Sequence, residues 1–100
     1  MSFILKKRLR TVSSRIRRLQ SELNVLDHQL VQLEEEAEDA RLRSLVSEGP
    51  AEAVAYDQAR RQRDILDREG ERQRRELEAL LADQDALLDR LAQKAQPADG

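Results

Sequence analysis

The side chains in this sequence that could do chemistry are mostly charged, and the most distinctive group is a basic segment near the start. Every charged side chain between residues 6 and 18 is positive. Lysine and arginine at this density provide salt-dependent affinity for phosphate groups and acidic lipid heads. We therefore expect that this segment can bind an anionic membrane or a nucleic-acid backbone. The candidate anion-binding residues are Lys6, Lys7, Arg8, Arg10, Arg15, Arg17 and Arg18.

The acidic and imidazole groups offer less chemistry. The stretch EEEAED at residues 34–39 supplies carboxylates, but it lacks the glycine-bearing turn of a calcium loop. His28 is the only histidine and there is no cysteine, which removes thiolate zinc sites and most imidazole-based catalysis. We predict a non-enzymatic protein with no metal, no cofactor, no catalytic residue and no small-molecule substrate.

The composition is typical of long helices. Charged residues make up 38% of the chain and aromatic residues only 2%, so few bulky rings are available to fill a globular core. No apolar run reaches the about 18 residues that a membrane-spanning helix needs. We expect a soluble, cytoplasmic protein.

Apolar residues recur in steps of four and three from residue 5 to residue 33, over four heptads. This is the periodicity of a helix that buries one narrow stripe against another helix. A second stripe is clear near the end of the chain and can be extended backward in heptads to residue 56. The predicted coiled-coil core is Leu5, Leu9, Val12, Ile16, Leu19, Leu23, Leu26, Leu30, Leu33, Leu66, Leu77, Leu80, Leu87 and Leu91.

The segment SEGPAEA, residues 47–53, interrupts the helical pattern. Gly49 suits a helix end, and Pro50 suits the first position of a new helix. We predict one helical domain over residues 1–96, with a helix at about 3–47, a turn at about 48–50 and a helix at about 51–96. Residues 97–100 would form a flexible tail. One long kinked helix is the alternative.

The distribution of charge favours antiparallel helices. A turn near residue 49 places the basic residues 6–18 beside residues 80–92, which contain Asp83, Asp85 and Asp89. It also places the acidic residues 34–39 beside residues 60–63, where three arginines lie. Matching of charge inside the hairpin is thus the alternative to external anion binding. The same pairing could form within one chain or by exchange between two chains.

The stretch DREGERQRRE, residues 67–76, has no apolar side chain and faces the region of Leu23, Leu26 and Leu30. A fully buried leucine contributes roughly 1.5–3 kcal/mol, so we expect a second copy to cover these leucines. The C-terminal stripe is also wider than one partner helix requires. The predicted fold is therefore an all-α, antiparallel two-helix coiled-coil hairpin that assembles as a homodimer into a four-helix bundle.

The region around the turn carries little charge and several apolar residues. After residue 40 the apolar pattern shifts phase, which gives a cluster at the end of the first helix. These residues could simply pack the helix ends together, or they could bind a partner. We predict an adaptor or scaffold that binds an unidentified protein through its helical faces or this tip. The candidate tip residues are Leu42, Leu45, Val46, Val54 and Tyr56.

The stretch AVAYDQARR, residues 53–61, is similar to the start of the second helix in the coiled-coil hairpin of bacterial transcript cleavage factors. That resemblance implies a hairpin that enters a channel of RNA polymerase and presents acidic residues at its tip. Glu48, Glu52 and Asp57 would then be the tip acids. The family's acidic tip motif is replaced here by LVSEGPAEA.

Overall fold

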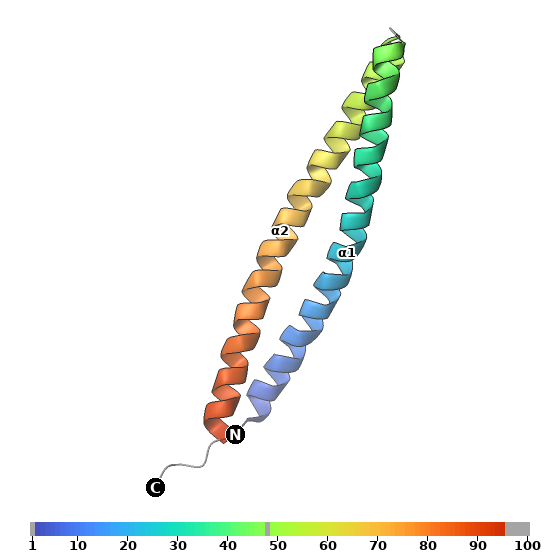
Figure 1. Cartoon of the computed structure of the whole chain (residues 1–100). Coiled ribbons are helices and arrows are strands. Elements are labelled where there is room, and N and C mark those ends of the chain that lie inside the picture. The colour runs from blue at the N-terminus through green and yellow to red at the C-terminus, as the bar shows by residue number, and fades with distance from the viewer. Residues whose placement is uncertain (1, 48, 96–100) are drawn as a thin grey trace. The chain divides into compact units, whose positions relative to one another are not determined.

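A computed structural model describes residues 2–47 and 49–95 of the chain. In this part of the chain the regular structure is entirely α-helical: helix α1 spans Phe3–Val46 and helix α2 spans Pro50–Ala95 (Figure 1). The prediction of an all-α chain with two long helices is confirmed. Glu48 and the predicted tail, residues 97–100, lie outside the described residues.

The two helices contribute to two compact units. Unit 1 contains residues 1–22 and 73–100, and unit 2 contains residues 23–72. In unit 1 the first turns of α1 lie beside the last turns of α2, since Ser2 and Lys6 line the same hollow as Leu91 and Ala95. In unit 2 the helices reverse direction between Val46 and Pro50. The pairing is therefore antiparallel in each unit.

The helix ends agree with the sequence that surrounds them. Ser2, a residue type favoured at helix N-caps, accepts a backbone hydrogen bond of 2.8 Å from Lys6. Pro50 occupies the first position of α2, where its missing N–H costs nothing. Gly49 has no positive φ; a Cβ there would lie 2.9 Å from Glu52 Oε2. The glycine therefore leaves room for a flexible carboxylate and is not needed for a left-handed turn.

The core is the stripe of residues on the facing sides of the helices, here called the seam, and most of its residues are apolar. Leu19 is the most deeply buried side chain, with 2% of its surface exposed. Every residue of the predicted coiled-coil core is buried or half-buried. The buried apolar residues are Leu5, Ile16, Leu19, Leu23, Leu26, Ala37, Ala40 and Leu87.

The expectation that Leu23 and Leu26 lack cover within one chain is wrong. They are only 7% and 5% exposed, respectively, without a second copy, and Leu30, the third leucine of that expectation, is half-buried. The physical reason is that several seam positions of α2 provide cover without a large apolar side chain, as at Arg63, Gly70 and Gln73. A buried glycine exposes backbone, and long polar side chains lay their aliphatic stems along apolar surface. These seam positions are buried or half-buried throughout: Tyr56, Ala59, Arg63, Leu66, Gly70 and Gln73.

The seam of α1 also continues to the turn without the expected shift of phase. Ala37 and Ala40 are buried and Ser44 is half-buried, which extends the steps of four and three residues. Leu42 and Leu45 instead lie on the outside. Small residues on the seam let two helices approach closely, and close approach suits helices that are about to join at a short turn. Residue size, and not only hydrophobicity, therefore decides which side of α1 faces inward here.

We expect the substitution Leu19→Ala to destabilise the protein by about 2–5 kcal/mol, because it removes buried methyl groups and leaves a cavity. Val25→Ala is the matched control, since Val25 is on the same helix and 57% exposed. That variant should stay within about 0.5 kcal/mol of the parent. Urea unfolding followed by circular dichroism measures both. Equal losses for the two variants would contradict the proposed seam.

Candidate functional site

The outer face of α1 in unit 1 carries most of the basic segment. Phe3, Lys7, Arg10, Ser14 and Arg17 are spaced by four and three residues in turn, as the seam residues are. Their row lies on the opposite side of the helix. All of them are exposed. A shallow hollow on this side is lined by Arg10, Thr11, Ser14, Arg15 and Arg18. The candidate anion-binding residues thus share one helical surface to a large extent.

Arg15 is the member of this group that is engaged inside unit 1. Its Nη2 donates to Glu76 Oε1 over 2.6 Å, and its Nε donates to the same oxygen over 3.2 Å. The hydrogen bond, followed by the charge of Glu76, raises the pKa of Arg15 above its usual value. A second link joins the helices nearby, where Gln84 Nε2 donates to Ser13 Oγ over 3.0 Å. These two contacts define the antiparallel register of unit 1.

The expected matching of the basic segment by Asp83, Asp85 and Asp89 is not found as ion pairs. In residues 2–22 and 73–95, the six other basic residues of the segment form no salt bridge with Asp83, Asp85 or Asp89. Asp83 lines a hollow together with Arg8 of the basic segment and Arg90, but it forms no salt bridge with Arg8. The three aspartates are exposed, so water solvates them at little cost. Six basic side chains of unit 1 are therefore available to an outside anion.

Two carboxylates of the acidic stretch of α1 in unit 2 pair with arginines on the same helix. Glu38 accepts from Arg41 over 2.7 Å, and this hydrogen bond lowers the pKa of the Glu38 carboxyl. Asp39 pairs with Arg43 one helical turn later. The expected pairing of these acids with arginines at 60–63 of α2 is not seen in the described residues. Partners three or four residues apart on one helix are already neighbours, so they cost less ordering than partners on two helices.

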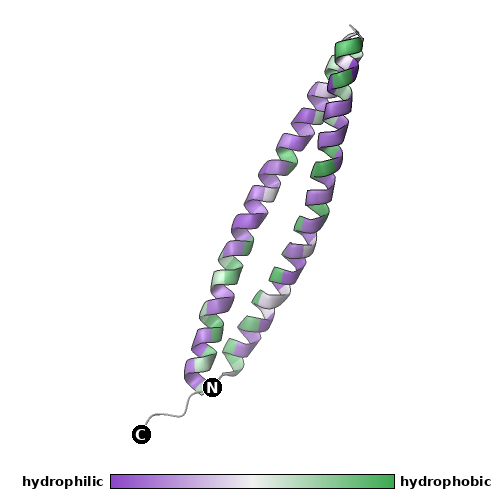
Figure 2. Ribbon diagram, viewed as in Figure 1, coloured by the Kyte–Doolittle hydropathy of each residue, from purple (hydrophilic) through white to green (hydrophobic). Residues whose placement is uncertain are grey.

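The tip residues of the sequence prediction are only partly brought together. Leu42 and Val46 line a hollow of unit 2 with Arg43, Ser47 and Glu52. Hydrophobic colour marks this end of α1 next to the turn (Figure 2). Val54 is 54% exposed but does not line this hollow. The cluster is thus centred on the end of α1.

Tyr56 has a structural position instead. It is half-buried at a seam position, and the guanidinium of Arg60 lies 5.9 Å from the centre of its ring. That distance is within reach of a cation–π contact along one helix face. Tyr56 therefore contributes to holding the helices together near the turn and does not extend the exposed cluster.

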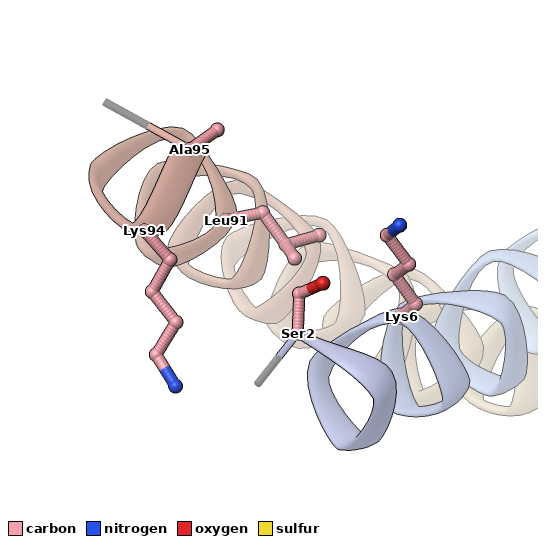
Figure 3. A pocket seen from close by; sticks show the side chains of 5 residues that line it. All are labelled: Ser2, Lys6, Leu91, Lys94 and Ala95. Carbon is pink, nitrogen blue, oxygen red and sulfur yellow. The ribbon is translucent and has the colours of Figure 1, made fainter. Parts of the chain in front are cut away.

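A further hollow of about 450 Å³ lies where α1 begins and α2 ends in unit 1. Figure 3 shows the side chain of Leu91 directed toward Ser2, with the ammonium groups of Lys6 and Lys94 on opposite sides of these two residues. Lys94 adds a positive charge from α2 to the basic end of this unit. The hollow is partly apolar and open to solvent at its rim.

His28 is exposed on α1, and its Nδ1 donates to the carbonyl oxygen of Asn24 over 2.7 Å. Among the described residues, no three His, Asp or Glu side chains come together as a group that could hold a metal ion. Over the same residues, neither helix is long and apolar enough to cross a bilayer.

Two of the acids implied by the resemblance to transcript cleavage factors can be placed. Glu52 is half-buried in the first turn of α2, and its charge contributes to raising the pKa of Arg43, after the larger effects of Asp39. Asp57 pairs with Arg61 over 2.9 Å. Glu48 lies outside the described residues. The two placed carboxylates both have an arginine as a neighbour in unit 2.

No protein-family model matches this sequence, and no curated protein and no solved structure matches it either. The surfaces of the two units are therefore the guide to function.

Several residues that hold the helices together were missed by the sequence reasoning. Ser44 continues the seam beyond Ala37 and Ala40, and the unbroken steps of four and three residues after Leu33 could have revealed it. The Arg15–Glu76 and Ser13–Gln84 contacts had no such signal. Polar residues at the edge of a seam are frequent, and only the register shows which of them meet.

The Ser13–Gln84 contact allows a test of whether the helices pair within one chain. We expect the double variant Ser13→Cys/Gln84→Cys, treated with a short thiol cross-linker, to run at the mass of a single chain in a denaturing gel. The parent has no cysteine, so no other thiol competes. Ser14→Cys/Gln84→Cys is the control, because Ser14 lies on the outer face and should link more slowly. A product of twice the chain mass from the first pair would show that the helices are exchanged between chains.

Proposed function

We propose that this protein is a non-enzymatic helical adaptor that binds a protein partner through the end of α1 next to the turn. The binding surface, here called the tip cluster, consists of Leu42, Leu45 and Val46. The observation that carries the proposal is their exposure: 50%, 68% and 88% of their surfaces, respectively, face solvent in unit 2. Grouped apolar side chains in water are typical of interaction sites.

Packing of the helix ends does not account for the tip cluster. That role falls to Ala37, Ala40 and Ser44, which lie on the seam, and to Tyr56 from α2. A turn that only reverses the chain would be served as well by polar residues on its outer side. Arg43 and Glu52 border the hollow that Leu42 and Val46 line, so an apolar centre has a charged edge. This arrangement resembles the apolar core and polar rim of a protein interface.

The non-enzymatic part of the proposal is supported by the nature of the surfaces. The hollows at the tip and on the outer face of α1 are shallow and open to water. Catalysis generally requires converging groups in a partly desolvated cleft. The charged side chains that line these hollows are mostly exposed, so water solvates them.

The tip cluster is tested by placing a photo-reactive amino acid at Val46 and irradiating the protein in extract of its own cells. We expect a discrete cross-linked protein, and we expect Leu45→Asp to reduce its yield at least about tenfold, as loss of a hot-spot side chain does. Val31 is the control position, because it is also a valine on the same helix with more than half of its surface exposed, at 54%. Probe placement at Val31 should give no such product, and Val31→Asp should leave the yield from Val46 unchanged. Identical labelling from both positions would refute a site at the tip.

We further propose that two copies assemble into a four-helix bundle. Leu81 and Leu88 support this assembly: they are seven residues apart on one flank of α2 and are 39% and 47% exposed, respectively. An apolar row beside the seam lets a helix contact a second neighbour in addition to its hairpin partner.

We expect light scattering to give twice the chain mass of 11.5 kDa at micromolar concentration. The double variant Leu81→Lys/Leu88→Lys should return the mass to that of one chain, because it places charges in the proposed interface. Ile65→Lys is the control, since Ile65 is 63% exposed and lies off this flank. A parent protein of single-chain mass would exclude the bundle and leave the tip proposal standing.

A further inference from the structure

The outer face of α1 in unit 1 has properties that the tip does not share and that adaptor function does not explain. We define the N-terminal basic face as Phe3, Ile4, Lys7, Arg10, Thr11, Ser14, Arg17 and Arg18. All of these residues point away from the seam and are exposed. The face extends over about 22 Å of helix, at a rise of 1.5 Å per residue.

The charge of this face is not neutralised inside unit 1. Lys7, Arg10, Arg17 and Arg18 form no salt bridge among the described residues, and residues 3–18 include no acid. Arg15 is different, because it turns toward α2 and binds Glu76. The aspartates of α2 lie on the neighbouring helix, and axes of packed helices are about 8–10 Å apart, which is comparable to the screening length in physiological salt. Four positive charges therefore act together on whatever approaches the outer face.

Apolar side chains are placed beside these charges. Phe3 and Ile4 are 66% and 68% exposed, respectively, in the first turn of α1. Phe3 and Lys7 are four residues apart, so they are neighbours on the same face. An exposed phenylalanine and isoleucine gain free energy by entering the boundary between lipid heads and acyl chains, while the basic groups stay at the headgroup level.

We propose that the N-terminal basic face binds the surface of an anionic lipid membrane, with Phe3 and Ile4 inserted into the interface. Lys7, Arg10 and Arg18 contact lipid phosphates and carboxylates, and Ser14 lines the same shallow hollow as Arg10 and Arg18. A nucleic-acid backbone would satisfy the charges but would give Ile4 nothing to bury against. Binding of this kind leaves the helix fold intact, because every residue involved already lies outside the seam.

The test is co-sedimentation of the full chain with vesicles of phosphatidylcholine, with and without phosphatidylserine. We expect binding only when phosphatidylserine is present, and we expect it to weaken as salt is raised. Each basic residue near such a surface strengthens binding about fivefold, so Lys7→Gln/Arg10→Gln/Arg18→Gln should weaken it about a hundredfold. Circular dichroism should show unchanged helix content in this variant.

Two further variants separate a specific face from general charge. Arg61→Gln/Arg68→Gln/Arg75→Gln removes the same number of charges from exposed positions of α2, and it should change binding by no more than about twofold if the face is specific. Phe3→Ser/Ile4→Ser keeps every charge and should weaken binding about tenfold or more through lost insertion. Equal losses in the two triple variants, or no loss in the serine variant, would overturn the proposal. Duplex DNA that binds more tightly than the vesicles, with no effect of the serine variant, would assign the face to nucleic acid instead.

Discussion

Burial of one apolar stripe on each helix is the interaction on which the other features of this protein depend. The chain has too few aromatic residues for a globular core, so apolar residues at steps of four and three residues, most of them leucines, form the core. A core one stripe wide leaves most of each helix in contact with water. This explains how a chain with 38% charged residues can fold, and why its outer faces are free to differ from one region to the next.

The size and polarity of the residues in the stripe change along the chain, and this change determines which apolar residues are left exposed. In α2 the seam changes from leucines near the end of the helix to Gly70 and Gln73, which are buried and half-buried, respectively, and which offer backbone and the stem of a polar side chain as cover. Toward the turn, Ala37 and Ala40 take over the seam. Since the small residues occupy the inside there, the large apolar residues of the same segment are left on the outside. The exposed surface proposed for partner binding is thus a consequence of how the helices approach each other.

Charge is arranged mainly within helices and not between them. Glu38 with Arg41 and Asp57 with Arg61 are pairs of neighbours on one helix, and such exposed pairs add little stability. Arg15 with Glu76 is a pair that joins α1 to α2 in unit 1. Because most of the basic segment is left out of this pairing, its charge belongs to the surface. The leucine seam sets the pairing of the helices, and the surface charges are then available for interactions with other molecules.

The sequence by itself determined the two helices, the turn near Pro50 and the residues of the seam, because each follows from local periodicity and backbone restriction. Even the weak heptad positions at Arg63 and Gln73, extended backward from Leu77, prove to face inward. Only the tertiary structure decided that Leu23 and Leu26 are covered within one chain, and that the seam runs through Ser44 rather than Leu45. Both depend on how closely two backbones approach, which is set by the sizes of residues far apart in sequence. The same applies to the basic segment. Its charges can be counted in the sequence, but the register of the helices decides which of them lie beside an acid of α2 and which face solvent.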